Sequence, residues 1–177
     1  MSDLDFYAHV ATRGNVLGTE SATGTGSGPA AWEAALGPDY LDDPGGGLLR
    51  RDYGLLEISF SDDEGPMSCF GFTVQVHRLI HYRSVPPSLA REYGEFASRV
   101  RFEELRSAVL SLGGSVEPDD LSGDIHRYRV PESGARIFVI DDPDPYGDGH
   151  HDVDDPEIHQ AGDVWALSLS PAWWGPR

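Results

Sequence analysis

Two consecutive prolines, Pro86-Pro87, divide the chain into stretches with different hydrophobic periods. In residues 54–61 and 69–80 apolar and polar residues alternate, which is the pattern of a strand that buries one face. From Ser88 to Leu112 apolar residues recur at three- and four-residue steps, and this period predicts helix. Because the two patterns occupy separate blocks of the chain, we expect an α+β fold with a mostly antiparallel sheet.

Further strands are expected from short apolar runs that end at turn residues, which brings the sheet to five or six strands. These runs are residues 48–51, 124–130, 136–140 and 164–170. In the longest predicted strand, residues 69–80, Phe70 and Phe72 are expected on the same face. Residues 42–47, DDPGGG, are interpreted as a turn, and residues 62–66, DDEGP, as a hairpin connection.

One main helical segment is expected after the two prolines. Ser88 is its predicted N-cap, and Gly113-Gly114 is its predicted end. The segment is also long enough to form two helices, separated by a break near Arg101-Phe102. Short helices are expected over residues 3–13 and 29–36.

The length of 177 residues indicates a single domain over residues 1–177, because domains average roughly 150 residues. Residues 18–30, rich in Gly, Ser and Thr, are expected to form a flexible loop and lack the pattern of a phosphate-binding loop. No apolar run approaches the roughly 18 residues of a membrane span, and the first residues do not resemble a secretory signal. We therefore expect a cytoplasmic protein.

The acidic loop, defined here as residues 141–163, is the most unusual segment of the sequence. It contains nine of the 30 acidic residues and no arginine, while the whole chain has a net charge of −17. Its prolines and glycines disfavour regular structure. Two interpretations stay open: a solvated connection between strands, or a recognition loop for a basic protein. In the second, the partner-binding residues are Asp141, Asp142, Asp144, Asp148, Asp152, Asp154, Asp155 and Glu157.

The net charge also excludes partners. Nucleic acids and anionic membranes are bound through basic patches, and a chain with 13 basic and 30 acidic residues is poorly suited to either. A basic protein is the class of partner that this charge favours.

A metal site is the main alternative for the acidic loop. His150, His151 and His159 lie among carboxylates, and both groups bind zinc or manganese. Their spacing matches neither HExxH nor an EF-hand, so adventitious binding is favoured over a functional metal, and no cofactor is expected. The sequence lacks the motifs of common hydrolases and nucleotide-binding enzymes. Cys69 lies in an apolar run, so we expect it to be a buried hydrophobic residue and not a catalytic thiol. We assign no catalytic residue; a metal-dependent hydrolase is the alternative function.

A second group of polar residues surrounds the longest predicted strand. His77-Arg78 and His81 could form an acid/base site with Asp52 or Glu57. We favour a structural role instead, in which arginine and aspartate pair within residues 50–53 and lock a turn.

The segments GLLRRDYGLLEISF (47–60), CFG (69–71) and VQVHRL (74–79) resemble small actinobacterial immunity proteins of polymorphic toxin systems. The resemblance covers residues 30–115 and implies an acidic cytoplasmic protein that binds and neutralises a cognate toxin. The acidic loop lies outside this region, so we expect it to be the partner-specific part. A structural or adaptor protein is a further alternative, in which the tail with Trp173-Trp174 docks on the sheet or forms an interface.

Overall fold

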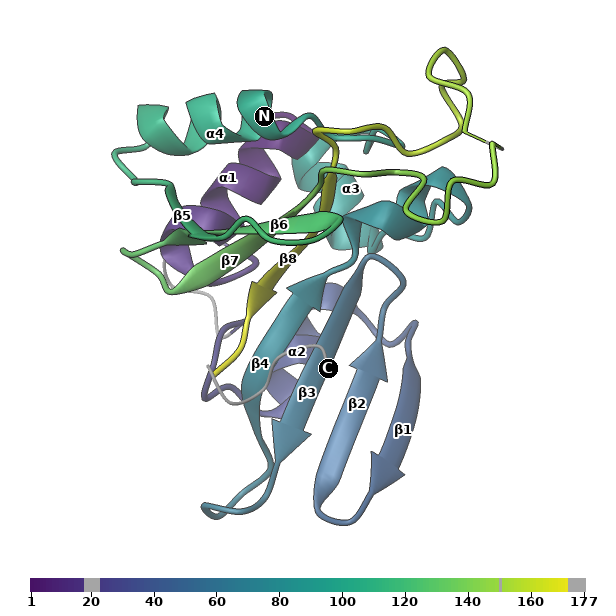
Figure 1. Cartoon of the computed structure of the whole chain (residues 1–177). Helices are drawn as coiled ribbons and strands as arrows, with labels where there is room; N and C mark the ends of the chain where they lie inside the picture. Colours follow the sequence, from purple (N-terminus) through teal and green to yellow (C-terminus); the bar gives the residue numbers. More distant parts are fainter. Residues whose placement is uncertain (18–22, 150, 172–177) are drawn as a thin grey trace.

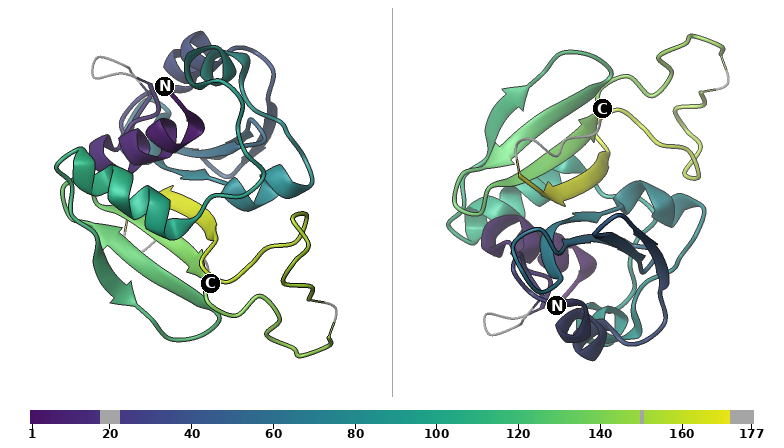
Figure 2. Two further views of the ribbon diagram at one scale, coloured as in Figure 1. Left: turned by 90° about the horizontal axis from the view of Figure 1, so that it is seen from above. Right: turned by 90° about the horizontal axis from the view of Figure 1, so that it is seen from below.

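The computed structural model describes residues 1–17, 23–149 and 151–171. These residues form one sheet of eight antiparallel strands, and the helices gather on the inner side of this strongly twisted sheet (Figures 1 and 2). The strands are β1 (Leu41–Gly45), β2 (Leu48–Asp52), β3 (Leu56–Ser61), β4 (Ser68–Val74), β5 (Glu117–Asp120), β6 (Ile125–Val130), β7 (Ala135–Ile140) and β8 (Val164–Leu169). The helices are α1 (Asp3–Arg13), α2 (Pro29–Leu36), α3 (Pro87–Tyr93), α4 (Phe102–Ser111) and the short 3-10 helix η1 (Val76–Ile80).

The order of the strands, β1-β2-β3-β4-β8-β7-β6-β5, is that of two four-stranded meanders joined through their last strands. The junction of β4 with β8 is short and consists of the pairs Phe72↔Leu169, Thr73↔Ser168 and Val74↔Leu167. The α+β class and the antiparallel sheet are thus confirmed. The expected number of five or six strands is too low, because both edge strands were missed.

The edge strands β1 and β5 lack the apolar alternation by which the other strands were found. Their sequences are LDDPG and EPDD, and all of their residues are exposed. Four of their five carboxylates pair with arginines across the ladder: Asp42 with Arg51, Asp43 with Arg50, Glu117 with Arg129 and Asp119 with Arg127. Proline and charge at an edge oppose pairing with a further strand, so both ends of the sheet are protected against aggregation.

The segment DDPGGG was interpreted as a turn, and this interpretation is wrong for its first half. Asp42 to Gly45 belong to β1, and only Gly46-Gly47 connect β1 to β2. Both of these glycines have positive φ, 58° and 81°, which is the backbone of a two-residue hairpin turn. The six residues therefore form most of an edge strand and its turn.

The predicted strand over residues 69–80 is also too long. β4 ends at Val74, and the chain then turns into η1. A bulge opposite Ser59 and Phe60 shifts the alternation, so that Phe72 is buried and Phe70 is only partly buried. Phe70 and Phe72 consequently do not share a face in the way that the pattern predicted.

The main helical segment divides into α3 and α4, with residues 94–101 between them in non-helical conformation. The predicted break near Arg101-Phe102 is thus the start of α4. Pro86, not Ser88, occupies the N-cap of α3. The expected helices at 3–13 and 29–36 are confirmed by α1 and α2.

One hydrophobic core joins both meanders and all four α-helices. Helix α1 lies at its centre, where the ring of Phe6 packs edge-to-face against Tyr7, Tyr93 and Phe96. Cys69 is buried in the same core, as expected, and burial raises the pKa of its thiol to about 12. The core therefore holds the two halves of the sheet in one rigid body.

Part of the expected flexible loop, residues 18–22, lies outside the described residues, as does the tail with Trp173-Trp174. The second half of that loop is fixed, because Ser27 and Gly26 exchange main-chain hydrogen bonds with Cys69 at 2.8 and 2.7 Å. In the described ranges, no helix combines the length and apolar character required to cross a bilayer.

Candidate functional site

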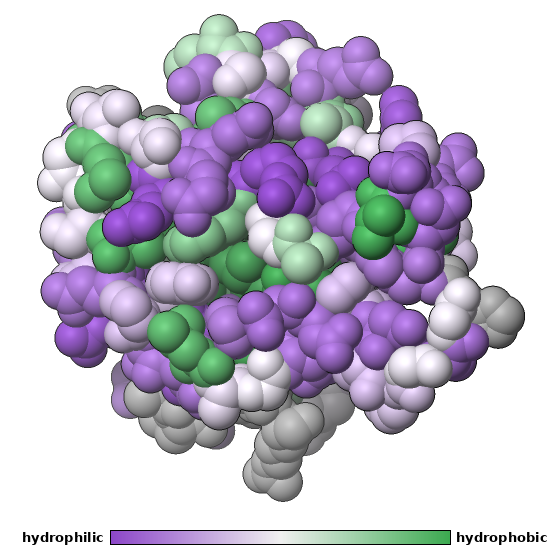
Figure 3. All heavy atoms as spheres, turned by 45° about the horizontal axis from the view of Figure 1, so that its top comes forward, coloured by the Kyte–Doolittle hydropathy of each residue, from purple (hydrophilic) through white to green (hydrophobic). Residues whose placement is uncertain are grey.

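The acidic loop connects β7 to β8 and projects away from the sheet beside η1 (Figures 1 and 2). Hydrophilic residues dominate the face of the molecule that Figure 3 shows. Most of the predicted partner-binding carboxylates lie in exposed residues; Asp144 and Asp155 are half-buried. The structure thus brings these residues together on one protruding segment.

Aspartates shape the loop through hydrogen bonds to its own main chain. Asp142 accepts the N–H of Asp144 at 2.9 Å, and Asp144 in turn accepts the N–H of Asp148 at 3.2 Å. Asp152 accepts the N–H of Asp154 at 3.0 Å, and Asp155 accepts the N–H two residues further on at 2.8 Å. The bonds from Asp142, Asp152 and Asp155 to the N–H two residues further on are Asx turns, which a short side chain favours. The preference for Asp over Glu in this segment therefore has a structural cause.

Asp163 anchors the end of the loop. Its side chain is 1% exposed, and it accepts hydrogen bonds from Arg99 at 2.7 and 3.1 Å and from Arg101 at 3.0 Å. It also accepts the main-chain N–H of Gln160 at 2.9 Å. Arg99 and Arg101 come from the segment before α4, so this cluster ties the loop to the helical layer.

Gln160 adds a second attachment within the loop. Its side-chain Nε2 donates to the main-chain carbonyls of Asp152 and Asp155 at 3.0 and 3.3 Å. The buried amide thus holds the turn that carries Asp152, Asp154 and Asp155 against the base of the loop. Sequence reasoning missed both anchors, because it counted Asp163 as one more acid and gave Gln160 no role.

The arginines of the protein body are largely neutralised. Ten of the thirteen form ion pairs with carboxylates. In the acidic loop, Asp163 is paired in this way, and Asp141 lies 3.5 Å from Nε2 of His126. In the described part of the chain, Asp142, Asp144, Asp152, Asp154, Asp155 and Glu157 form no ion pair with an arginine. These six carboxylates lie within residues 142–157, so this part of the loop carries a dense cluster of carboxylates without an arginine partner.

The structure describes only part of the histidine group on which the metal hypothesis depends. His159 is half-buried and packs against the ring of Trp165 at 5.2 Å, while His150 lies outside the described residues. No group of three or more His, Cys, Asp or Glu side chains that could hold a metal ion occurs within residues 1–17, 23–149 and 151–171. The described geometry gives His159 a packing role.

His77 lies on the other side of this contact. Its ring stacks on Trp165 with a centroid distance of 4.0 Å and an interplanar angle of 1°. Its Nδ1 donates to the carbonyl oxygen of Trp165 at 3.2 Å, because a carbonyl can only accept. The acidic loop, β8 and η1 therefore meet at one aromatic cluster.

We expect acidification from about pH 7.5 to about pH 5.5 to lower the free energy of unfolding. Burial holds the pKa of His77 and His159 below the ordinary value near 6.5; Arg78 and Arg99 lower it further, while Glu57 and Asp163 oppose the shift. The unfolded chain therefore takes up protons first, so this stability is complete above about pH 6.5 and declines below it.

Urea denaturation at both pH values measures the effect. A His159→Gln variant, which cannot take up the proton, should lose less stability than the wild-type protein over the same interval. An equal loss in both proteins would show that His159 does not contribute to the pH dependence.

Arg78, and not a histidine, binds the two carboxylates of the hypothetical acid/base site. Its guanidinium donates to both oxygens of Asp52 at 3.1 Å and to Oε2 of Glu57 at 2.7 Å. The expected pairing within residues 50–53 is also wrong, because Arg51 instead binds Asp42 of β1 at 2.8 and 3.0 Å. The network is structural and fixes η1 to the turn between β2 and β3.

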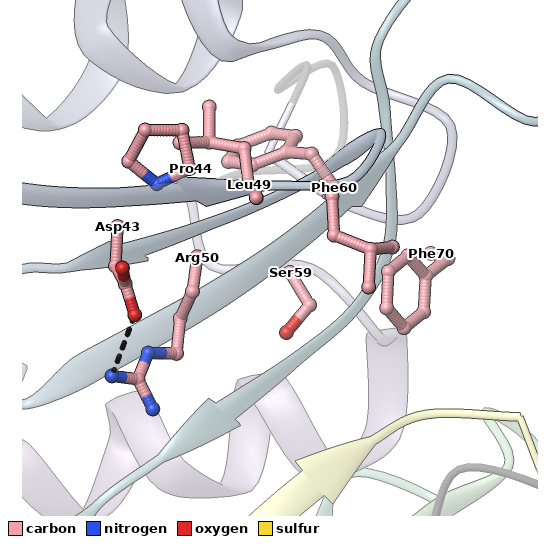
Figure 4. Close-up of a pocket in the computed structure, with 9 residues that line it drawn as sticks. Asp43, Pro44, Leu49, Arg50, Ser59, Phe60 and Phe70 are labelled. Atoms are coloured by element: carbon pink, nitrogen blue, oxygen red, sulfur yellow. Dashed lines mark hydrogen bonds and ion pairs between the residues drawn. The ribbon is translucent and has the colours of Figure 1, made fainter.

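Two hollows lie at opposite ends of the first meander. One, of about 280 Å³, is at the β1–β2 hairpin and is lined mainly by apolar side chains such as Leu49, Phe60 and Phe70; the Asp43–Arg50 ion pair of 3.3 Å lies at its edge (Figure 4). The other, of about 620 Å³, lies beside η1 on the side of the acidic loop. The second is lined by Arg78 of η1, and η1 is linked to the loop because His77 and His159 both pack against Trp165.

Comparisons with protein-family models, with curated proteins and with solved structures give no match to this chain.

Proposed function

We propose that this protein is an immunity protein that binds a basic protein toxin through the acidic loop and blocks an active or essential surface of the toxin. The observation that carries the proposal is the distribution of charge. Arginines of the body are paired with carboxylates, whereas the loop presents unpaired carboxylates on a protruding segment that its own Asx turns and anchors hold in shape.

This arrangement suits tight and fast association. Clustered carboxylates attract a cationic partner over a distance and raise the association rate. Loop residues that turns and anchors already hold in place lose less conformational entropy on binding than disordered ones, and the hydrogen bonds of the described loop residues supply such restraints. The resemblance of residues 30–115 to immunity proteins supports a toxin as the partner, and the position of the loop outside that region supports a partner-specific role.

The decisive test replaces Asp152, Asp154 and Asp155 with asparagine. Asparagine retains the side-chain oxygen that accepts the main-chain N–H in an Asx turn, so the loop keeps its shape and loses three charges. We expect the affinity for the toxin to fall roughly tenfold and its dependence on salt to flatten, because each exposed ion pair contributes up to about 1 kcal/mol.

The matched control is the triple variant Asp62→Asn, Asp63→Asn and Glu64→Gln. These three residues are exposed on the connection between β3 and β4. Their substitution removes the same number of charges as the first triple variant, but outside the acidic loop. Pull-down from the native host with mass spectrometry identifies the partner, and titration calorimetry and rescue of toxin-expressing cells compare the variants. A partner that is acidic, or equal affinity of both triple variants, would contradict the proposal.

A further inference from the structure

The hollow of about 620 Å³ beside η1, here called the tyrosine pocket, is a candidate second contact region for the partner of the acidic loop. Its lining includes Asp39, Leu41, Asp52, Arg78 and Tyr82. A volume of this size is sufficient for a large side chain of a partner. The pocket combines aromatic, aliphatic and acidic groups, which together suit a long cationic side chain.

The floor of the pocket is rigid and carries no free positive charge. Arg78 donates to Asp52 and to the carbonyl of Gly54 at 3.0 Å, and it also binds Glu57. The main-chain N–H of Leu55 donates to the carbonyl of Ser84 at 2.9 Å. Because two carboxylates share the Arg78 guanidinium, this arginine does not repel an incoming cation.

The rim of the pocket exposes surface that is typical of a binding site. Leu41 is 78% exposed and Tyr82 is 73% exposed, and both border the same hollow. Asp39 is exposed beside them and forms no ion pair with any described residue. An exposed tyrosine next to an aliphatic side chain and a carboxylate offers both packing and a hydrogen-bond acceptor.

The protein itself shows how arginine is held by these groups. The guanidinium of Arg51 lies 3.7 Å from the centroid of the Tyr40 ring and forms a bidentate pair with Asp42 at 2.8 and 3.0 Å. Tyr82 and Asp39 supply the same two chemical groups at the rim of the tyrosine pocket. Planar guanidinium can stack on tyrosine and fork to a carboxylate at once, which an ammonium cannot do.

We propose that the tyrosine pocket receives an arginine side chain of the basic partner, with the aliphatic stem against Leu41 and the guanidinium between Tyr82 and Asp39. The identity of the partner rests on the proposed function. Helix η1 joins the two contact regions, because His77 packs against β8 beside the acidic loop while Arg78 lines the pocket. The loop would supply charge, and the pocket would supply a specific anchor.

The test is a titration of the full chain with N-acetyl-arginine N-methylamide, followed by amide chemical shifts. The lysine and norleucine analogues serve as matched probes. With the arginine probe we expect saturable chemical-shift changes around Gly54 and Tyr82. The lysine probe should bind at least several-fold more weakly, and the norleucine probe should cause no saturable change. Tyr82→Leu should weaken binding of the arginine probe about three- to fivefold, and Asp39→Asn should also weaken it.

The control Tyr146→Leu removes a tyrosine that is 93% exposed on the acidic loop, and it should leave the affinity for the arginine probe unchanged. Equal binding of norleucine, shifts confined to the loop, or unchanged affinity in Tyr82→Leu would each overturn the inference. Its failure is distinguishable from failure of the proposed function. If the toxin binds through the loop while the probe does not bind in the pocket, only the inference fails; if the probe binds and the host contains no basic toxin partner, only the proposed function fails.

Discussion

Replacing Asp163 with asparagine is expected to lower the free energy of unfolding by about 3 kcal/mol. The substitution removes the charge that two arginines share and places an amide N–H₂ against their donors. The loss is smaller than for a fully buried pair, because Arg99 and Arg101 keep side-chain exposures of 24% and 48% and can be hydrated. Urea denaturation followed by circular dichroism measures it.

Asp154→Asn is the matched control on the same loop, since Asp154 is exposed. Its effect should stay within about 0.5 kcal/mol. Burial alone raises the pKa of the Asp163 carboxyl, but hydrogen bonds from Arg99, Gln160 and Arg101 hold it below the ordinary value. The stability from Asp163 is therefore present above about pH 4 and is lost as the pH falls further. Equal stability of both variants would show that the anchor is unimportant.

The substitution Gly54→Ala is expected to destabilise the protein by about 3 kcal/mol or more. Gly54 has φ of +86°, and a Cβ atom there would lie 2.5 Å from Cβ of Ser84 and 2.7 Å from its carbonyl oxygen. Ser84 cannot move away without breaking its hydrogen bond to Leu55. Thermal and urea denaturation measure the loss, and amide shifts of residues 76–84 report whether η1 is displaced.

The variant Gly113→Ala separates the cost of a side chain at positive φ from the cost of the close contact with Ser84. Gly113 has a similar φ of +82°, but no atom lies within 4 Å of the position of its Cβ. It therefore carries only the conformational cost of a side chain at positive φ, about 1 kcal/mol. If both variants lose the same stability, the close approach of Gly54 to Ser84 has no energetic importance.

The inner strands and the helices could be predicted from the sequence because burial imposes a period. Leu56, Ile58 and Phe60 alternate with polar residues and are fully buried in β3. The acidic loop was found with correct boundaries between β7 and β8, because composition changes there and strands flank it. These elements follow rules that act over a few neighbouring residues.

The rest depends on contacts between residues far apart in the sequence. β1 and β5 have no buried face, so they become strands through pairing with arginines of the neighbouring strand. η1 interrupts an alternating pattern because Arg78 binds carboxylates more than 20 residues away. The role of Asp163 depends on Arg99, which lies 64 residues earlier. Local periodicity contains no information about such partners.

The position of α1 has a consequence for synthesis of the chain on the ribosome. This helix is made before the strands, yet it packs against α4 and against β7 of the second meander, and Ser133 donates a hydrogen bond to its Ala11 carbonyl. At roughly 5–20 residues per second, about 130 further residues take some 6–25 s to emerge. During that time the surface of α1 that contacts β7 has no permanent cover. A chain interrupted before β7 therefore leaves apolar surface of α1 accessible to chaperones and proteases.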